Sequence, residues 1–350
     1  MNILVTGGAG FIGCNLTSRL IRDGHDVVVF DNLSRPGTRH NIAWLEAQGV
    51  FTLREQDITD SSALASVFRD HEFSTVIHLA GQVAVTTSVA DPRSDFNSNA
   101  LGTFNVLEAT RQSGQNCTFL YSSTNKVYGG MEQIAIVEKE GRYCYDSYPS
   151  GIPEEAPLDF HSPYGCSKGA GDQYVRDYAR IYGMRTVVFR QSCIYGPHQM
   201  GVEDQGWLAW FAIAVLSGNP ITIYGDGRQV RDVLYVDDLI EAYLAAIERI
   251  DDVAGQVFNI GGGPENTLAI WAGYGPMLEK QLDQTIPVEF DDWRPGDQRV
   301  FISNIEKAGR LLGWQPKYGP EHGVPLMVDW IVDNKELFVN NSLHTGDSGT

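Results

Sequence analysis

Short apolar runs alternate with segments of helical periodicity through the first half of the chain. The strand-like runs cover residues 3–6, 27–30, 51–53, 75–79, 118–122 and 186–189. Several are almost entirely apolar, as is typical of parallel strands that are covered on both faces. Between them, apolar residues recur three or four positions apart, as at Leu16, Leu20 and Ile21. This alternation predicts an α/β fold with a doubly wound parallel sheet.

The rhythm changes after about residue 190, where turn signals such as Gly196-Pro197 interrupt it. One more strand-like run, at 257–260, ends in three glycines and is expected to return to the first sheet. We therefore expect one domain from residues 1–190 and 231–263, and a smaller, discontinuous α/β domain from 191–230 and 264–335. Residues 130–158 are expected to form a long functional loop. The tail 336–350 is expected to be disordered.

Composition narrows the class of protein. The 350 residues carry a formal net charge of -18, which disfavours general nucleic-acid binding and is typical of a soluble acidic protein. There is neither an apolar run of about 20 residues, as a membrane span needs, nor a basic, cleavable leader. The five scattered cysteines disfavour a disulfide framework and a metal site such as zinc. We expect a cytoplasmic location.

The first strand leads directly into a glycine-rich loop, Gly7-Gly8-Ala9-Gly10-Phe11-Ile12-Gly13, which opens a helix. Glycines let the backbone approach a pyrophosphate, and the helix N-terminus supplies N–H donors and a positive dipole end. A chance glycine-rich turn is the alternative, but the flanking strand and helix favour a Rossmann dinucleotide site. Asp31 ends the second strand, where a carboxylate binds ribose hydroxyls and repels a 2′-phosphate, so it favours NAD over NADP. Arg35 acts against that preference.

Further cofactor contacts are expected at the ends of the neighbouring strands, where small and polar residues follow each apolar run. The expected cofactor contacts are Gly7, Gly10, Phe11, Ile12, Gly13, Asp31, Asn32, Ser34, Arg35, Asp57, Ile58, Leu79, Ala80, Gln82, Asn99, Ser122, Tyr164 and Lys168.

Tyr164 and Lys168 lie four residues apart, which places a phenol and an ammonium on one face of a helix. A free tyrosine has a pKa near ~10, and a neighbouring cation favours the phenolate. Ser123 and Thr124 follow the fifth strand and are candidates for binding a reacting hydroxyl. An incidental pair on a surface helix is the alternative. The preceding dinucleotide loop favours a catalytic role for Tyr164, Lys168, Thr124 and Ser123.

Together these motifs resemble the extended short-chain dehydrogenase/reductase superfamily over residues 1–335. The resemblance rests on the glycine loop, Ser122-Ser123-Thr124, Tyr164 with Lys168, and Arg231-Asp232-Val233. Closer similarity to the CDP-tyvelose (CDP-paratose) 2-epimerases lies in residues 122–129, 159–169, 204–207 and 297–301.

The resemblance implies an isomerase. Tyr164 removes a proton from a sugar hydroxyl, the hydride on that carbon passes to a retained NAD, and the keto-sugar turns and takes the hydride back on its other face. It also implies a CDP-linked nucleotide-diphosphate sugar as substrate and a homodimer formed through the helix that carries Tyr164. The expected substrate contacts are Thr124, Asn125, Gln205, Tyr224, Arg231 and Arg299. Interdomain salt bridges with Asp232 or Asp297 are an alternative role for the two arginines.

Two other activities remain as alternatives. The 4,6-dehydratases need an Asp-Glu pair after the threonine, but Asn125-Lys126 follows Thr124 here, which disfavours dehydration. A UDP-hexose 4-epimerase uses the same core, and residue spacing does not distinguish C2 from C4. A non-catalytic NAD-binding sensor has no need of Tyr164 and Lys168. The base, the natural sugar and the pathway stay open.

Overall fold

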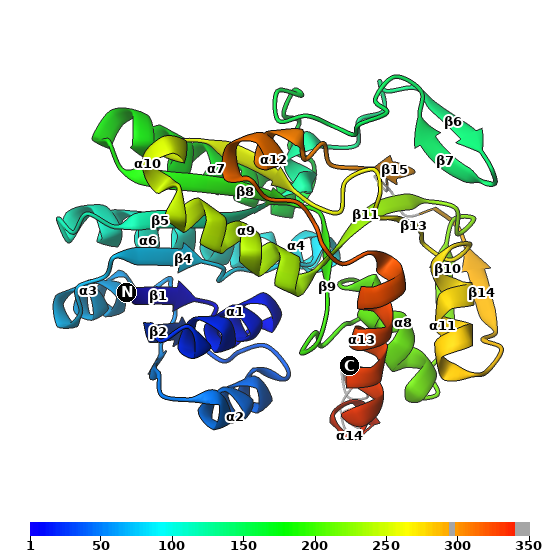
Figure 1. Cartoon of the computed structure of the whole chain (residues 1–350), viewed down its shortest axis with the longest axis horizontal. Coiled ribbons are helices and arrows are strands. Elements are labelled where there is room, and N and C mark those ends of the chain that lie inside the picture. Colours follow the sequence, from blue (N-terminus) through cyan, green and yellow to red (C-terminus); the bar gives the residue numbers. More distant parts are fainter. Residues whose placement is uncertain (294–297, 340–350) are drawn as a thin grey trace.

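The computed structural model describes residues 1–293 and 298–339. Within these residues, a seven-stranded parallel sheet in the order β12-β8-β5-β4-β1-β2-β3 forms the larger part of the molecule (Figure 1). Its strands are β1 (Asn2–Thr6), β2 (Asp26–Asp31), β3 (Thr52–Glu55), β4 (Thr75–His78), β5 (Thr118–Thr124), β8 (Arg185–Gln191) and β12 (Val257–Ile260). The expected doubly wound Rossmann sheet is confirmed, and the run at 257–260 does return to it by pairing with β8.

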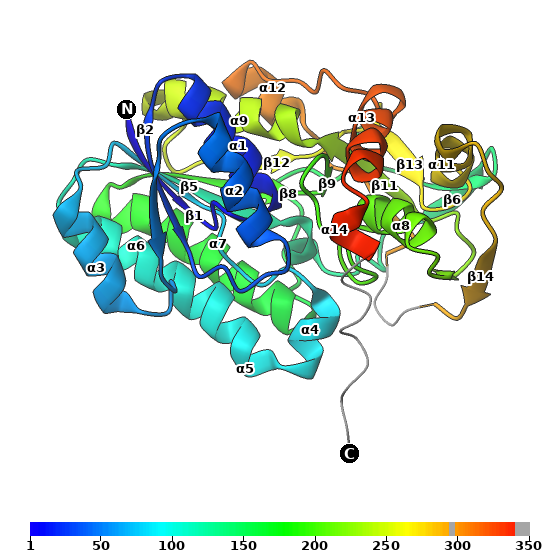
Figure 2. The ribbon, with the colours of Figure 1, turned by 90° about the horizontal axis from the view of Figure 1, so that it is seen from below.

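Helices cover both faces of this sheet (Figure 2). On one face lie α1 (Phe11–Arg22), α2 (Thr38–Gln48), α9 (Val236–Glu248), α10 (Ile250–Val253) and α12 (Glu306–Leu312). On the other lie α3 (Ser61–Asp70), α6 (Gly102–Gln112) and α7 (Ser162–Tyr182), with α4 (Val85–Ala90), α5 (Pro92–Asp95) and the π-helical turn η1 (Phe96–Leu101) beside α7. Because both faces are covered, most of these strands have an apolar central run, as the sequence pattern indicated.

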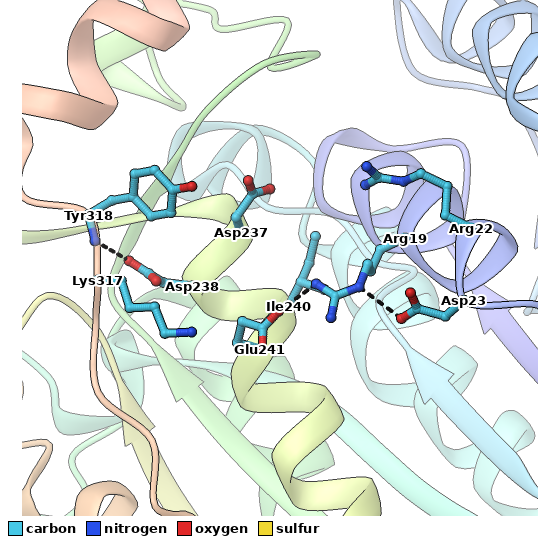
Figure 3. A pocket seen from close by; sticks show the side chains of 9 residues that line it. All are labelled: Arg19, Arg22, Asp23, Asp237, Asp238, Ile240, Glu241, Lys317 and Tyr318. Atoms are coloured by element: carbon cyan, nitrogen blue, oxygen red, sulfur yellow. Dashed lines mark hydrogen bonds and ion pairs between the residues drawn. The ribbon is translucent and has the colours of Figure 1, made fainter.

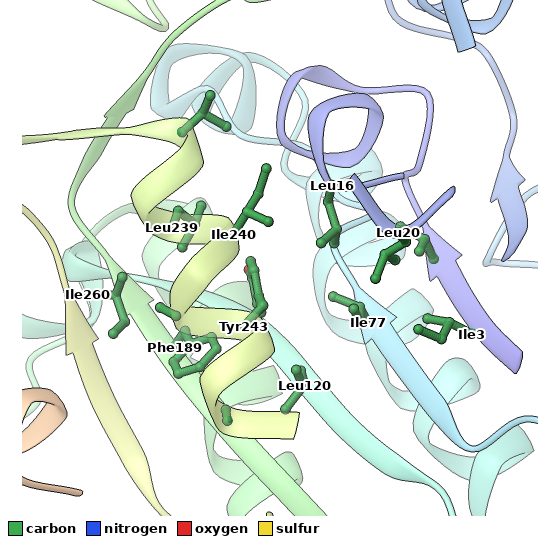
Figure 4. Close-up of a cluster of buried hydrophobic side chains, with 14 of the residues drawn as sticks. Ile3, Leu16, Leu20, Ile77, Leu120, Phe189, Leu239, Ile240, Tyr243 and Ile260 are labelled. Carbon is green, nitrogen blue, oxygen red and sulfur yellow. The ribbon is translucent and has the colours of Figure 1, made fainter. Parts of the chain in front are cut away.

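The core between the sheet and the first helical layer is made of aliphatic and aromatic side chains that are almost fully buried. Figure 4 shows Leu16 and Leu20 of α1 facing Ile3 and Ile77 of the sheet, while Tyr243 of α9 packs against Phe189. Each such side chain contributes roughly 1.5–3 kcal/mol of burial free energy. This packing fixes α1, and with it the glycine loop that precedes α1.

The smaller part of the molecule lies beyond the carboxyl ends of the main strands (Figure 1). Its strands are β9 (Cys193–Tyr195), β10 (Ile221–Tyr224), β11 (Val230–Tyr235), β13 (Thr267–Ala269), β14 (Val288–Asp291) and β15 (Val300–Phe301). Its helices are α8 (Trp207–Leu216), α11 (Tyr274–Leu282), α13 (Pro320–Asp333) and α14 (Glu336–Val339). Strand β11 pairs with β9, β13 and β15, and α8, α11 and α13 share a second hydrophobic core.

Two local expectations are corrected. Residues 130–158 are not wholly a loop, because β6 (Ile136–Lys139) and β7 (Arg142–Tyr145) form an antiparallel hairpin. The buried Tyr145, whose hydroxyl donates to the Val300 carbonyl at 2.8 Å, fastens the hairpin to β15. Residues 336–339 are helical rather than disordered, and the remainder of the expected tail, 340–350, lies outside the described residues. Across the described residues, no helix is both long and apolar enough to cross a membrane.

Candidate active site

The glycine loop is held by close backbone contacts. Gly7 has a φ of +72°, and a Cβ there would lie 2.6 Å from the Ala80 nitrogen at the end of β4. A Cβ on Gly13 would lie 2.1 Å from the Gly7 carbonyl oxygen. No residue with a side chain fits at either position. Gly10 is the N-cap of α1 and has no side chain, so no side-chain cap occupies the backbone N–H groups of the first turn. Such N–H groups are what the pyrophosphate of NAD requires.

Asp31 lies at the carboxyl end of β2, next to this loop. Its Oδ2 accepts a hydrogen bond from the Ala9 N–H at 3.0 Å, and its Oδ1 accepts one from the Leu33 N–H at 2.8 Å. Burial raises the pKa of the Asp31 carboxyl, and these two N–H donors oppose that rise. The carboxylate is thus fixed against the backbone of the glycine loop.

The residues after Asp31 form a polar rim. The Asn32 amide donates to the Asp57 carboxylate at 2.6 Å, and the Ser34 hydroxyl donates to Asn32 Oδ1 at 2.7 Å. Arg35 reaches farther, and its guanidinium donates to Gln205 Oε1 in the smaller part of the molecule. The structure therefore brings together one expected cofactor residue and one expected substrate residue, a pairing that the sequence did not indicate.

The remaining expected cofactor residues follow β3 and β4. The backbone of Leu79 and Ala80 lies against Gly7, so the carboxyl ends of β1 and β4 are in close contact. The Asn99 amide, in η1, donates to the Gln82 carbonyl at 2.9 Å and fixes the turn after β4. Ile58 is 7% exposed and belongs to the core beneath α6. These residues gather at the carboxyl edge of the sheet, where ligands of such folds bind.

Helix α7 carries the expected catalytic pair into the same place. Pro163 lies in the first turn of the helix, where a missing N–H costs nothing. Tyr164 and Lys168 follow one turn apart and are 8% and 5% exposed. The Lys168 ammonium donates to the Ser122 carbonyl at 2.5 Å and lies 4.5 Å from the centre of the Tyr121 ring. Lys168 is therefore tied to the end of β5.

The acidities of the pair differ from the sequence-based expectation. Burial raises the pKa of Tyr164 to about 12, while a hydrogen bond with Thr124 and the charge of Arg35 oppose the rise. Burial also lowers the pKa of Lys168 to about 7, against the charges of Asp95 and Asp172. The expected lowering of the Tyr164 pKa by Lys168 is not seen, because the ammonium is buried and directed at the Ser122 carbonyl. The phenolate needs a further positive charge, which the pyridinium ring of NAD⁺ carries.

The two hydroxyls at the end of β5 are used differently. Thr124 hydrogen-bonds with Tyr164, and its hydroxyl also donates to Asn125 Oδ1 at 3.3 Å. Ser123 donates instead to Asp172 Oδ2 at 2.9 Å, inside the packing of α7. Neighbouring residues of a strand point to opposite faces, which separates the two. Thr124 and Asn125 lie beside the phenol, whereas Ser123 supports the helix.

A buried ion pair behind the catalytic helix was not anticipated. Arg190 of β8 binds Asp172 of α7 through two N–H···O contacts of 2.9 and 3.0 Å, and the residues are 2% and 0% exposed. Arg190 also donates to the Tyr128 hydroxyl at 3.1 Å. The pair joins α7 to β8, and Ser123 of β5 bonds to the same carboxylate. These contacts hold α7, and with it Lys168, in position against the sheet. A signal was present in the sequence, because a charged residue, Arg190, directly follows the apolar run at 186–189.

The expected substrate residues of the smaller part lie on adjacent strands. Arg231 of β11 is 7% exposed and donates to the Val230 carbonyl at 3.0 Å. Arg299, just before β15, is exposed, and its guanidinium lies 5.4 Å from the Tyr143 ring and 5.1 Å from the Trp293 ring. The stacking partner Tyr143 comes from the unexpected hairpin.

The other groups in this region are engaged as follows. The Tyr224 hydroxyl donates to Glu203 at 2.9 Å. The Asp232 carboxylate accepts hydrogen bonds from the Ser192 hydroxyl and the Gly263 N–H, whereas Asp297 lies outside the described residues. The alternative role of the two arginines, a salt bridge with Asp297, therefore falls outside the described residues.

A separate pocket lies between α1 and α9 and contains none of the expected site residues (Figure 3). Charges of both signs line it, and they pair with one another: Arg19 binds Asp23 at 2.8 Å and also binds Glu241. It lacks the glycine-rich backbone and the phenol–ammonium pair of the strand ends, so the candidate active site is the group of residues gathered at the carboxyl edge of the main sheet.

Comparison with known proteins agrees with this geometry. Residues 3–261 match the model of the NAD dependent epimerase/dehydratase family. The chain is 45% identical to the CDP-paratose 2-epimerase of Salmonella typhi, across 94% of this chain and 99% of that protein. The UDP-glucose 4-epimerase of Thermotoga maritima, solved with UDP-glucose, superimposes with a TM-score of 0.83 at 34% identity, covering 95% and 99% of the two chains.

A third relative, the UDP-glucuronic acid 4-epimerase of Bacillus cereus, was solved with UDP-glucuronic acid and NAD. It superimposes with a TM-score of 0.81 at 30% identity, covering 95% of this chain and 100% of that one. The expected cofactor, NAD, is the one that the family description names. On the family match and these full-length similarities, the chain belongs to the NAD dependent epimerase/dehydratase family.

Proposed function

We propose that this protein inverts the configuration at C2 of a CDP-linked sugar of the paratose or tyvelose type by transient oxidation. One observation carries the proposal. Tyr164, Thr124 and Lys168 are buried together beside a backbone cradle for NAD, in a chain that is 45% identical to a CDP-paratose 2-epimerase. A phenol, a hydroxyl donor and an ammonium in a dry site are what proton transfer to and from a sugar hydroxyl needs.

Each residue has a distinct role. Thr124 orients the sugar oxygen, and Tyr164 takes its proton and later returns it. Lys168, tied to the Ser122 carbonyl, holds the nicotinamide ribose. Bound NAD supplies the hydride acceptor and donor for the sugar carbon. Arg231 is buried and Arg299 is stacked on two rings, so we assign them to the diphosphate, which guanidinium groups bind well.

We further propose two domains: an NAD domain close to residues 1–190 with 231–263, to which α12 adds its packing on the main sheet, and a nucleotide-sugar domain close to 191–230 with 264–335, to which β11 adds its pairing with β9, β13 and β15. With the diphosphate held by Arg231 of β11 and Arg299 beside β15, the sugar is free to turn between two hydride transfers. Anchoring next to the anomeric carbon leaves C2 close to the pivot. This supports oxidation at C2 in the same site that other family members use for C4.

The test is direct. The purified enzyme is incubated with CDP-paratose, UDP-glucose and GDP-mannose, each deuterated in separate samples at C2 or C4, and the products are followed by NMR. We expect inversion at C2 of the CDP-sugar with the deuterium retained on that carbon. Tyr164→Phe is the inactive control. Inversion at C4 of UDP-glucose, with no reaction of the CDP-sugar, would instead establish the second candidate, which the Thermotoga maritima structure favours.

We also propose a homodimer formed through α6 and α7. The outer face of these helices and of η1 exposes large apolar side chains, which in other proteins mark contact surfaces. They are Phe96, Leu101, Phe104, Tyr174, Ile181 and Tyr182. Phe104 and Tyr174 already pack edge to face at 5.7 Å and form the centre of the face.

Light scattering after size exclusion tests this face. Phe104→Glu is expected to yield monomers, whereas Val50→Glu, at a 93% exposed position, leaves the mass unchanged. A dimer that persists in Phe104→Glu would place the contact elsewhere.

All five cysteines are free thiols, which supports our proposal of a reducing, cytoplasmic location.

A further inference from the structure

The segment between β9 and α8, residues 196–206, crosses from one part of the molecule to the other and is called the strap below. It begins beside α1, where the Asn15 amide donates to the Pro197 carbonyl at 2.9 Å. It continues over α2, where the Met200 side chain packs on Gly37. It ends at Gln205, which accepts a hydrogen bond from Arg35. The strap is thus fastened at three places to the elements that form the proposed NAD site.

His198 lies in the middle of the strap in a demanding conformation. Its φ is +66°, which side-chain-bearing residues adopt only where their surroundings hold them. The ring is 5% exposed and lies between two tryptophans, 3.9 Å from Trp44 of α2 and 4.8 Å from Trp330 of α13. Trp44 and Trp330 come from different parts of the molecule, α2 beside the main sheet and α13 in the smaller part. His198 therefore joins the two parts of the molecule.

A chain of contacts leads from His198 to the glycine loop. The His198 Nδ1 lies 3.3 Å from Asn41 Oδ1, and the Asn41 amide donates to the Ala9 carbonyl at 2.9 Å. The Ala9 N–H is itself bound by the Asp31 carboxylate at 3.0 Å. The ring is therefore one residue removed from the backbone that would cradle the cofactor pyrophosphate.

We propose that His198 is a positioning residue that sets how long NAD stays bound, by pinning the strap and α13 to α2 and the glycine loop. The proposal rests on the proposed function, because an enzyme that oxidises and re-reduces one sugar needs its cofactor to remain through both steps. Release of NAD past the glycine loop then requires α2 to separate from the strap. That movement breaks the contacts of the His198 ring with Trp44, Trp330 and Asn41 together.

Two variants separate the contributions of the ring. His198→Gly removes it and suits the positive φ, so the backbone of the strap is kept without strain. His198→Phe keeps an aromatic side chain between the tryptophans but removes the contact with Asn41. His71→Ala is the control, because His71 also stacks on an aromatic ring, Phe73 at 5.6 Å, but lies after α3, away from the strap.

The experiment uses the NAD-loaded enzyme. The complex is diluted rapidly, and the NAD that appears in the filtrate is measured against time. Loss of the stack and the hydrogen bond is expected to speed release about tenfold or more in His198→Gly, with a smaller effect in His198→Phe. His71→Ala should match the wild type. With saturating NAD added, turnover of both His198 variants should return to within about twofold of the wild type, which a damaged catalytic site would not allow.

The outcomes are distinct. Release rates within about twofold of the wild type in His198→Gly would overturn the proposal, as would equal acceleration in His71→Ala. If His198→Gly does not fold, the release rate of His198→Phe decides in the same way. Turnover of the variants that added NAD does not restore also counts against it. Wild-type protein that neither retains nor takes up NAD would instead refute the proposed function.

Discussion

Lys168 offers a quantitative test of the electrostatics of the site, through Lys168→Met. The ammonium is 5% exposed, and burial lowers its pKa from the ordinary value of 10.5 to about 7. Its folded pKa lies below its unfolded pKa, so between pH 7 and 10.5 the unfolded chain binds more protons than the folded chain. The free energy of unfolding contributed by this group therefore rises with pH through that window. Methionine fills a similar volume and does not titrate.

The size of the effect follows from the shift. One pKa unit corresponds to ~1.36 kcal/mol, so the buried ammonium costs the folded state roughly 4 kcal/mol at pH 7 and roughly 2 kcal/mol at pH 9. The variant also loses the hydrogen bond to the Ser122 carbonyl, worth about 1.5–3 kcal/mol for a charged donor. We expect Lys168→Met to be more stable than the wild type by roughly 1–2 kcal/mol at pH 7, and this advantage to fall by about 2 kcal/mol at pH 9.

The assay is urea unfolding of nucleotide-free protein at pH 7, 8 and 9, followed by tryptophan fluorescence. The difference between the two proteins isolates Lys168, because the other titrating groups are common to both. Lys280→Met is the control, since this lysine lies on α11 in the smaller part and is not among the site residues. A stability difference that does not change with pH would refute the buried, depressed ammonium. A wild type that gains relative stability toward lower pH would refute the sign.

Three further substitutions test the site. Tyr164→Phe should lower turnover at least about 100-fold, which is the usual effect of losing a general acid–base catalyst. The NAD content of the purified protein should stay unchanged. The control Tyr174→Phe, at an exposed position on the same helix, should remain active. Asp172→Asn should lower the free energy of unfolding in urea by about 3–5 kcal/mol, because its arginine partner is left buried without a counter-ion. The control Asp177→Asn, on the exposed side of the same helix, should change the free energy of unfolding by less than about 0.5 kcal/mol. Gly13→Ala should abolish NAD binding in a calorimetric titration, since the added Cβ would lie 2.1 Å from a carbonyl oxygen, and wild-type affinity in this variant would contradict the cradle.

Much of the site follows from local pattern. Apolar runs bounded by turns predicted the strands of the sheet because a strand covered on both faces has no polar positions to spare. The glycine loop was recognisable because a strand, a tight turn and a helix start are contiguous in sequence. The spacing of Tyr164 and Lys168 sufficed to place them on one face of α7, since helical geometry is local.

The tertiary structure decided what those residues experience. Burial raises the pKa of Tyr164 and lowers that of Lys168, and the amount of burial depends on elements far away in sequence. The hairpin at 136–145 was not predicted, because its two four-residue strands are of mixed polarity and show no clear strand pattern. They are stabilised by pairing with each other and by the Tyr145 contact with β15.

Long-range partnerships were equally beyond the sequence. Asp172 meets Arg190 from another element, and His198 meets Trp44 and Trp330 from two others. The sequence by itself determined the sheet, the NAD loop and the spacing of the catalytic pair, because these depend on residues a few positions apart. Only the tertiary structure decided the acidities, the support behind α7 and the strap over the cofactor loop, because each depends on which distant side chains exclude water from a given group.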